Sequence, residues 1–123
     1  MGADELQKQP PSALEDNLKK ALTELMILFL LSRKDCYIGE LTAMINRRSG
    51  GALTIVFPYG AIYRLQQSGY ILELEMRTAP DGRRRQYYRI TKPGRQYLEQ
   101  LLDTYSRLSK GISDVLTKEE SAE

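Results

Sequence analysis

Residues 70–90, with the sequence YILELEMRTAPDGRRRQYYRI, contain the pattern that decides the fold. From Leu72 to Arg77, apolar and charged residues alternate, which is the period of a β-strand with two different faces. The APDG sequence that follows is a strong turn signal, and residues 83–90 then return as a second strand. The stretch predicts a β-hairpin whose turn end carries three consecutive arginines.

Two short helices are expected directly before this hairpin. Residues 39–46 place their large apolar side chains on one face, and a pair of glycines ends that helix a few residues later. A second helix begins near residue 57, with a proline in its first turn, and ends at Gly69. Helix, turn, helix and hairpin follow in the order of a winged helix-turn-helix domain, which we expect over residues 13–92.

A longer helix is expected on each side of these elements. The first begins at a Ser12 capping signal and runs to about Ser32. Over residues 25–31 it is apolar on all sides, so more than one face of the helix must be buried against other elements or another subunit. The last, over residues 93–116, follows a Thr91 cap and repeats apolar residues at spacings of three and four. Both stripes predict a homodimer. The expected dimer interface is Leu14, Leu18 and Leu25 in the first helix and Leu98, Leu101, Tyr105, Leu108, Ile112 and Val115 in the last.

Charge is distributed unevenly along the chain. The formal net charge is only +2, but residues 33–97 contain twelve basic and five acidic side chains. The segments before and after them are acidic, with net charges of −2 and −3. A basic centre between two acidic helices favours a partner that carries phosphates, and we expect double-stranded DNA.

The second short helix carries the expected base-reading face. With Ile62 and Leu65 pointing inward, a turn of about 100° per residue directs a largely hydrogen-bonding face outward. Arginine and glutamine on such a face can make paired contacts to guanine or adenine edges, while the alternative is a plain solvated surface. The residues expected to contact DNA there are Tyr59, Gly60, Tyr63, Arg64 and Gln67.

The arginines at the hairpin turn are the expected phosphate contacts. Arg83, Arg84 and Arg85 are consecutive, and Arg77 and Arg89 lie on the two arms of the hairpin. Strand alternation places Arg83 and Arg85 on one face and Arg84 on the other. A solvated charge run is the alternative, but a basic hairpin beside a reading helix favours contacts with the DNA backbone.

The composition excludes several kinds of chemistry. The chain has no histidine, so Ser-His-Asp and Cys-His catalysis and His-ligated zinc are all unavailable. Its single cysteine, Cys36, fits a reducing cytoplasm and is expected to be a small buried residue rather than a redox sensor. The longest apolar run, at residues 25–31, is too short to span a membrane. We expect a cytoplasmic binding protein with no catalytic residue, metal or cofactor, and not an enzyme.

Two stretches of the chain resemble the PadR family of transcriptional regulators. They are FPYGAIYRLQQSGYI at residues 57–71 and GRRRQYYRITKPGRQYL at residues 82–98. In that family a tyrosine opens the recognition helix and a glycine-aliphatic pair ends it, and a basic wing leads into an aromatic strand and a Thr-x-x-Gly-x-x-x-Leu helix start. The matching residues are Tyr59, Gly69, Ile71, Tyr87, Tyr88, Thr91, Gly94 and Leu98, and Tyr37 with Ile38 also fits.

The resemblance implies a dimeric winged-helix repressor of the smaller subfamily, whose single C-terminal helix packs against the partner subunit. Gly60 stands where the family often has proline, and Tyr70 where leucine is more usual, so no operator preference is carried over. Some relatives bind flat aromatic ligands between tryptophans, which this chain lacks. A small aromatic effector stays open, with Phe29, Tyr97 or Tyr105 either lining its pocket or packing in the core or interface.

The fold expected from the sequence is mainly α with a two-stranded β wing: a winged helix-turn-helix followed by a C-terminal dimerisation helix. Residues 1–12 are expected to be a flexible arm and residues 117–123 a disordered tail. The expected function is sequence-specific DNA binding as a homodimeric repressor on a palindromic operator. The alternative is a winged-helix adaptor that dimerises and binds other proteins but not DNA.

Overall fold

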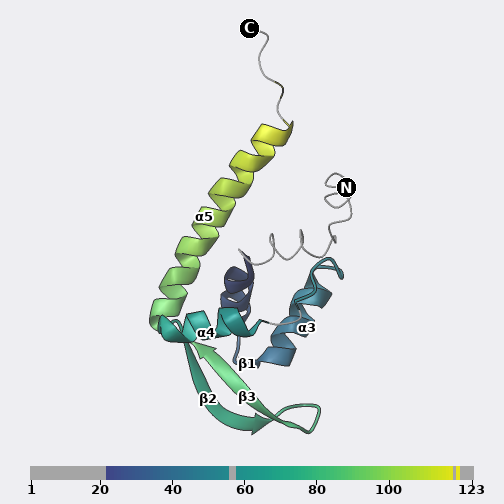
Figure 1. Ribbon diagram of the computed structural model, residues 1–123, viewed down its shortest axis with the longest axis vertical. Helices are drawn as coiled ribbons and strands as arrows, with labels where there is room; N and C mark the ends of the chain where they lie inside the picture. The colour runs from purple at the N-terminus through teal and green to yellow at the C-terminus, as the bar shows by residue number, and fades with distance from the viewer. Residues whose placement is uncertain (1–21, 56–57, 118, 120–123) are drawn as a thin grey trace, which may run out of the picture.

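The computed structural model describes residues 22–55, 58–117 and 119 of the chain. A helix over residues 22–31 precedes the other elements. These are β1 (Cys36–Tyr37), α3 (Ile38–Arg48), α4 (Tyr59–Gln67), β2 (Ile71–Thr78), β3 (Arg84–Ile90) and α5 (Lys92–Thr117). The long helix α5 extends away from the other elements, and the hairpin of β2 and β3 projects from the opposite end of the molecule (Figure 1).

The predicted winged helix-turn-helix is confirmed, with one difference in its sheet. The strands are ordered β1-β3-β2, so the wing has three antiparallel strands and not two. Cys36 pairs with Tyr88 and Tyr37 with Tyr87, which places β1 along the second arm of the hairpin. A segment of only two residues is too short to show strand periodicity, so the sequence did not reveal this pairing.

One hydrophobic core joins the helices to one face of the sheet. Its largest fully buried side chains come from the helix over residues 22–31, from α3, from α4 and from β2. They include Ile27, Leu28, Leu31, Leu41, Leu65 and Ile71. A register shift between Glu73 and Met76 interrupts the regular pairing of β2 with β3. Ile71 faces the core, whereas the side chains of Leu72 and Met76 are exposed. The second half of β2 therefore adds little to this core.

The start of α5 is bound tightly to the end of α4. The Thr91 hydroxyl accepts a hydrogen bond from the Gly94 amide at 3.0 Å, as the predicted N-cap requires, and donates one to the Gly69 carbonyl at 2.7 Å. The Thr91 amide donates to the Tyr70 carbonyl at 3.0 Å. The rings of Tyr70 and Tyr97 stack above this junction, with centroids 4.3 Å apart. A single threonine thus joins the ends of α4 and β3 to the first turn of α5.

Replacing Thr91 with valine is expected to lower the free energy of unfolding by about 1–2 kcal/mol, because the shape is kept while the cap and the bond to Gly69 are lost. Thr42→Val is the matched control, since it removes one bond from the hydroxyl to the Gly39 carbonyl within a turn. We expect the control to change stability by less than about 0.5 kcal/mol. Urea unfolding of both variants measures the difference, and equal losses would contradict this role of Thr91.

The distal half of α5 has an apolar stripe that nothing in the described chain covers. Leu98 is only 7% exposed and Leu101 is partly buried, but exposure rises along the helix to 80% at Val115. Tyr105, Leu108 and Ile112 between them are exposed. Of the expected interface residues in the first helix, Leu25 is partly buried against the core, while Leu14 and Leu18, like the expected arm, lie outside the described residues.

Candidate nucleic-acid interface

The outward face of α4 is exposed at every position that the helical wheel assigned to it. Ala61, Ile62 and Leu65 are buried, which fixes the rotation of the helix against the core. The outward side chains are then free of the core, with Tyr59 and Tyr63 61% and 63% exposed. The exposed face consists of Tyr59, Gly60, Tyr63, Arg64 and Gln67.

Arg64 is held in one orientation by a contact that the sequence did not reveal. Its Nε donates to the Glu24 carboxylate at 2.8 Å, across 40 residues of chain. Its Nη1 lies 3.4 Å from the point that a Cβ of Gly60 would occupy, so the guanidinium lies back over the start of α4. With Nε paired to Glu24, the two terminal nitrogens remain as donors toward a ligand.

The tip of the wing is a tight turn that presents two arginines. The Ala79 amide donates to the Arg83 carbonyl at 2.8 Å, and Gly82 has a φ of +83°, which favours glycine. Arg83 lies in the turn and Arg84 begins β3, and both are exposed. Among the described residues, no carboxylate forms an ion pair with either of them.

Arg85 differs from Arg83 and Arg84 because its guanidinium group contacts other side chains of the protein. Its Nη2 donates to the Asp81 carboxylate at 2.7 Å, and its guanidinium lies over the Tyr37 ring at 5.2 Å from the centroid. The hydrogen bond from Arg85 lowers the pKa of Asp81 below its ordinary value. Of the three consecutive arginines, Arg85 is therefore partly neutralised and packed.

The solvent side of the sheet carries alternating arginine and tyrosine side chains. Arg85, Tyr87 and Arg89 share this side of β3, with Arg77 opposite Arg85 and Tyr37 opposite Tyr87. The Tyr37 and Tyr87 rings meet edge to face at 5.5 Å, and Arg77 lies over the Tyr87 ring at 5.1 Å. Tyr87 is buried beneath these neighbours, so the layer covers this side of β3 from Arg85 to Arg89.

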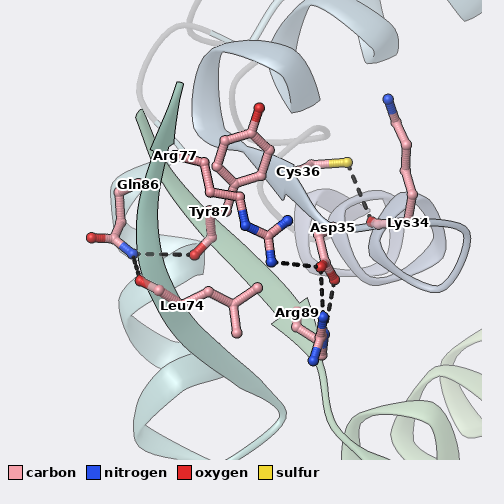
Figure 2. Close-up of polar contacts among 8 residues, drawn as sticks. All are labelled: Lys34, Asp35, Cys36, Leu74, Arg77, Gln86, Tyr87 and Arg89. Atoms are coloured by element: carbon pink, nitrogen blue, oxygen red, sulfur yellow. Dashed lines mark hydrogen bonds and ion pairs between the residues drawn. The ribbon is translucent and has the colours of Figure 1, made fainter. Parts of the chain in front are cut away.

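Asp35, in the turn before β1, receives hydrogen bonds from both arms of the wing (Figure 2). Arg89 donates to both of its carboxylate oxygens, at 3.0 and 2.8 Å, and Arg77 donates to one at 3.3 Å. The hydrogen bond from Arg89 is the largest cause of a lowered pKa for Asp35, with Arg77 acting in the same direction. The three side chains form a fork that joins the wing to the helix-turn-helix.

An apolar groove of about 290 Å³ lies between the helix over residues 22–31, the end of α3 and the middle of α5. Phe29 and Tyr105 contribute to its lining, whereas Tyr97, the third aromatic residue considered for a ligand pocket, stacks on Tyr70 instead. Arg33 and Arg48 lie over the Phe29 ring at 5.0 and 5.6 Å. The groove is therefore aromatic and apolar inside with cations close to its edge.

The described residues offer little for catalysis. No three aspartate, glutamate or cysteine side chains within them converge as metal ligands do. Cys36 is fully buried, as expected, and its thiol donates to the Lys34 carbonyl at 3.4 Å. Burial raises the pKa of this thiol to about 11, so it stays protonated and unreactive at neutral pH.

Helices long and apolar enough to cross a bilayer are absent from the part of the chain that the structure describes. The candidate interface consists of hydrogen-bonding side chains on α4 and arginines on the wing, together with the acidic residues that pair with some of them. The sequence predicted the first two groups, and their role as DNA contacts stays a prediction. It did not reveal Glu24 and Asp35, because the partners of these carboxylates lie 40 and more residues away along the chain.

Comparison with known proteins gives a consistent result. The model of the PadR-like family of transcriptional regulators matches residues 27–100. An uncharacterised protein of Lysinibacillus sphaericus is 30% identical over 89 residues, which are 71% of this chain and 81% of the relative. A transcriptional regulator of Clostridium thermocellum is 28% identical with a TM-score of 0.71, covering 83% of this chain and 99% of that one.

A PadR-like transcriptional regulator of Bacillus cereus has the same fold, with a TM-score of 0.71 at 24% identity, covering 84% of this chain and 99% of that one. The family model spans the helix-turn-helix, the wing and the start of α5, which are the elements that carry the candidate interface. The chain belongs to the PadR-like family of transcriptional regulators, and it is a regulator rather than an enzyme.

Proposed function

We propose that the protein is a sequence-specific DNA-binding repressor that acts in the cytoplasm as a homodimer on a palindromic operator. The observation that carries the proposal is a pair of exposed surfaces on one winged-helix domain. One is the outward face of α4, and the other is the tip of the wing with Arg83 and Arg84. Regulators of this family bind DNA, and these are the surfaces with the matching chemistry.

In this proposal α4 lies in the major groove and the wing lies along the backbone. Arg64 and Gln67 donate to base edges, Tyr59 and Tyr63 contact the adjacent sugar and phosphate groups, and Gly60 permits close approach. Arg83 and Arg84 contact phosphates, while Arg85 supports the tip from its place between Asp81 and Tyr37.

The dimer is supported by the stripe along α5. Leu98 and Leu101 pack within the subunit, while Tyr105, Leu108, Ile112 and Val115 continue the same seam in solvent. A monomer would gain nothing from exposing four large apolar side chains at heptad spacing, whereas two copies bury them against each other. Leu14, Leu18 and Leu25 of the first helix complete the proposed interface.

Selection from a pool of random duplexes at two salt concentrations tests the reading surface. We expect an enriched palindrome whose half-site spacing follows from the dimer. Gln67→Ala and Arg64→Lys are expected to change the selected bases while leaving the dependence of affinity on salt nearly as it was, because neither acts on phosphates. A change in salt dependence with unchanged base preference would show that α4 does not read bases.

The groove beside Phe29 and Tyr105 supports a small aromatic effector as a second partner. Its volume and apolar lining suit a ligand of that kind, and the helix that lines it also carries Glu24, the residue that holds Arg64. Calorimetric titration with planar aromatic compounds, with and without operator DNA, is the corresponding test. Binding that is equally strong to both forms would separate the groove from DNA release.

A winged-helix adaptor remains the second candidate, because the exposed seam of α5 would serve it equally well. The adaptor requires neither the arginines of the wing tip nor the polar face of α4. The same selection distinguishes the two functions: enrichment of no sequence by a folded, dimeric protein would favour the adaptor over the repressor.

A further inference from the structure

The fork at Asp35 joins the two parts of the domain to which the proposed function assigns different contacts with DNA. Asp35 belongs to the turn between the helix over residues 22–31 and β1, on the helix-turn-helix side, whereas Arg77 and Arg89 belong to the wing. The Asp35 side chain is only 20% exposed, and both of its oxygens accept hydrogen bonds from guanidinium groups. Figure 2 shows the carboxylate between the two arginines.

The geometry removes these arginines from a free phosphate-binding role. Arg89 directs Nε and Nη2 at Asp35 together, which is the two-pronged contact that a guanidinium would otherwise make with a phosphate. Arg77 donates one bond to Asp35 while its flat face covers the ring of Tyr87. Both are thus committed within the protein, in contrast to Arg83 and Arg84 at the tip.

We propose that Asp35 is a specificity-determining positioning residue, which fixes the wing against the helix-turn-helix and withholds Arg77 and Arg89 from indiscriminate contact with DNA backbones. The inference rests on the proposed function. A wing held at one angle meets the backbone only when α4 is seated in its groove, so phosphate contacts and base contacts form together. Without the Asp35 contacts the wing keeps its pairing with β1 but is less constrained, and its two extra free arginines bind any duplex.

The test compares Asp35→Asn with the wild-type full-length protein on the selected operator and on a duplex of unrelated sequence, over a range of salt concentrations. The change removes the charge and keeps the shape. We expect tighter binding to the unrelated duplex, with a plot of log K against log salt that is steeper by about 1 to 2, because up to two arginines gain phosphates. The ratio of operator to unrelated affinity is expected to fall about tenfold, comparable to one mismatched base pair.

Asp81→Asn is the matched control. Asp81 also pairs with a wing arginine, but its partner Arg85 is four residues away on the same hairpin, so both members of this ion pair belong to the hairpin. This variant is expected to steepen the salt dependence by at most about 1 and to leave the affinity ratio unchanged. Simple loss of folded protein would lower both affinities together without changing the salt dependence, so it is distinguishable from the expected result.

Arg89→Gln tests the fork from its other side and does not depend on the folding of the Asp35 variant. If Arg89 contacts no phosphate in the wild type, the salt dependence stays the same while the affinity ratio falls. A salt dependence weaker by about 0.9 would overturn the proposal, because it would show that Arg89 binds the backbone directly. An unchanged ratio in Asp35→Asn would overturn it as well. Wild-type protein that binds no duplex would refute the proposed function together with this inference, whereas wild-type binding with an unchanged ratio refutes the inference alone.

Discussion

Replacing Gly94 with alanine is expected to lower the free energy of unfolding by about 3 kcal/mol, which is a large part of the stability of an ordinary domain. A Cβ at this position would lie 2.1 Å from the Tyr70 carbonyl oxygen and 2.8 Å from Cγ1 of Ile90. Backbone cannot move aside as a flexible side chain does, and the Tyr70 carbonyl also accepts the amide hydrogen bond of Thr91. The methyl group would therefore separate α5 from the rest of the domain.

Gly111→Ala is the matched control for this variant, because Gly111 lies in the same helix with nothing within 4 Å of its Cβ position. Alanine there is expected to stabilise the protein by up to about 1 kcal/mol, since it is the better helix former. Denaturant unfolding followed by circular dichroism measures both changes. Similar effects at the two positions would mean that the close approach of α5 to Tyr70 is not maintained in solution.

Changing Arg83 and Arg84 together to alanine is expected to weaken binding to every duplex, by roughly tenfold or more at low salt. Both are exposed, and among the described residues neither guanidinium group forms an ion pair with a carboxylate, so each is available to a phosphate. The salt dependence of log K is expected to fall by about 0.9 for each lost contact, and the preferred sequence to stay the same. Titration of labelled operator at several salt concentrations measures both quantities.

Arg85→Ala is expected to have the smaller effect, because it removes a cation that Asp81 already partly neutralises. Lys110→Ala serves as a charge control, since Lys110 is paired with Asp114 on the distal part of α5 and is expected to contribute nothing to DNA binding. A double Arg83 and Arg84 variant with wild-type affinity and salt dependence would show that the wing tip is not the backbone contact.

Much of the domain could be predicted because its signals are local. The period of α4 assigned Ile62 and Leu65 to the core, and this assignment alone determines which side chains face outward. The cap at Thr91 was also predictable, since it depends only on a hydroxyl and an amide three residues apart. Signals of this kind involve residues that are only a few positions apart, so the sequence alone is enough to predict the contact.

The rest of the site could not be predicted, because it depends on pairs that only the folded chain brings together. Asp35 and Arg89 are 54 residues apart, and no periodicity links an acidic turn residue to a particular strand. From the sequence, Arg77 and Arg89 are two of the cations on a basic hairpin, whereas in the structure both donate hydrogen bonds to the Asp35 carboxylate. Charge arithmetic locates a basic region, but the ion pairs decide which of its cations are free.

The junction at Thr91 has a mechanical consequence for the proposed dimer. The Thr91 hydroxyl bonds both the Gly69 carbonyl, two residues beyond the end of α4, and the Gly94 amide in the first turn of α5, so α5 is an arm whose base is tied to the end of α4. The 26 residues of α5 give that arm a length of about 39 Å, and a tilt of about 5° between paired arms displaces their ends by about 3 Å. In the proposed dimer, the separation of the two α4 helices therefore depends on the angle at which the subunits cross. A small change in that angle would move both helices out of register with successive turns of DNA.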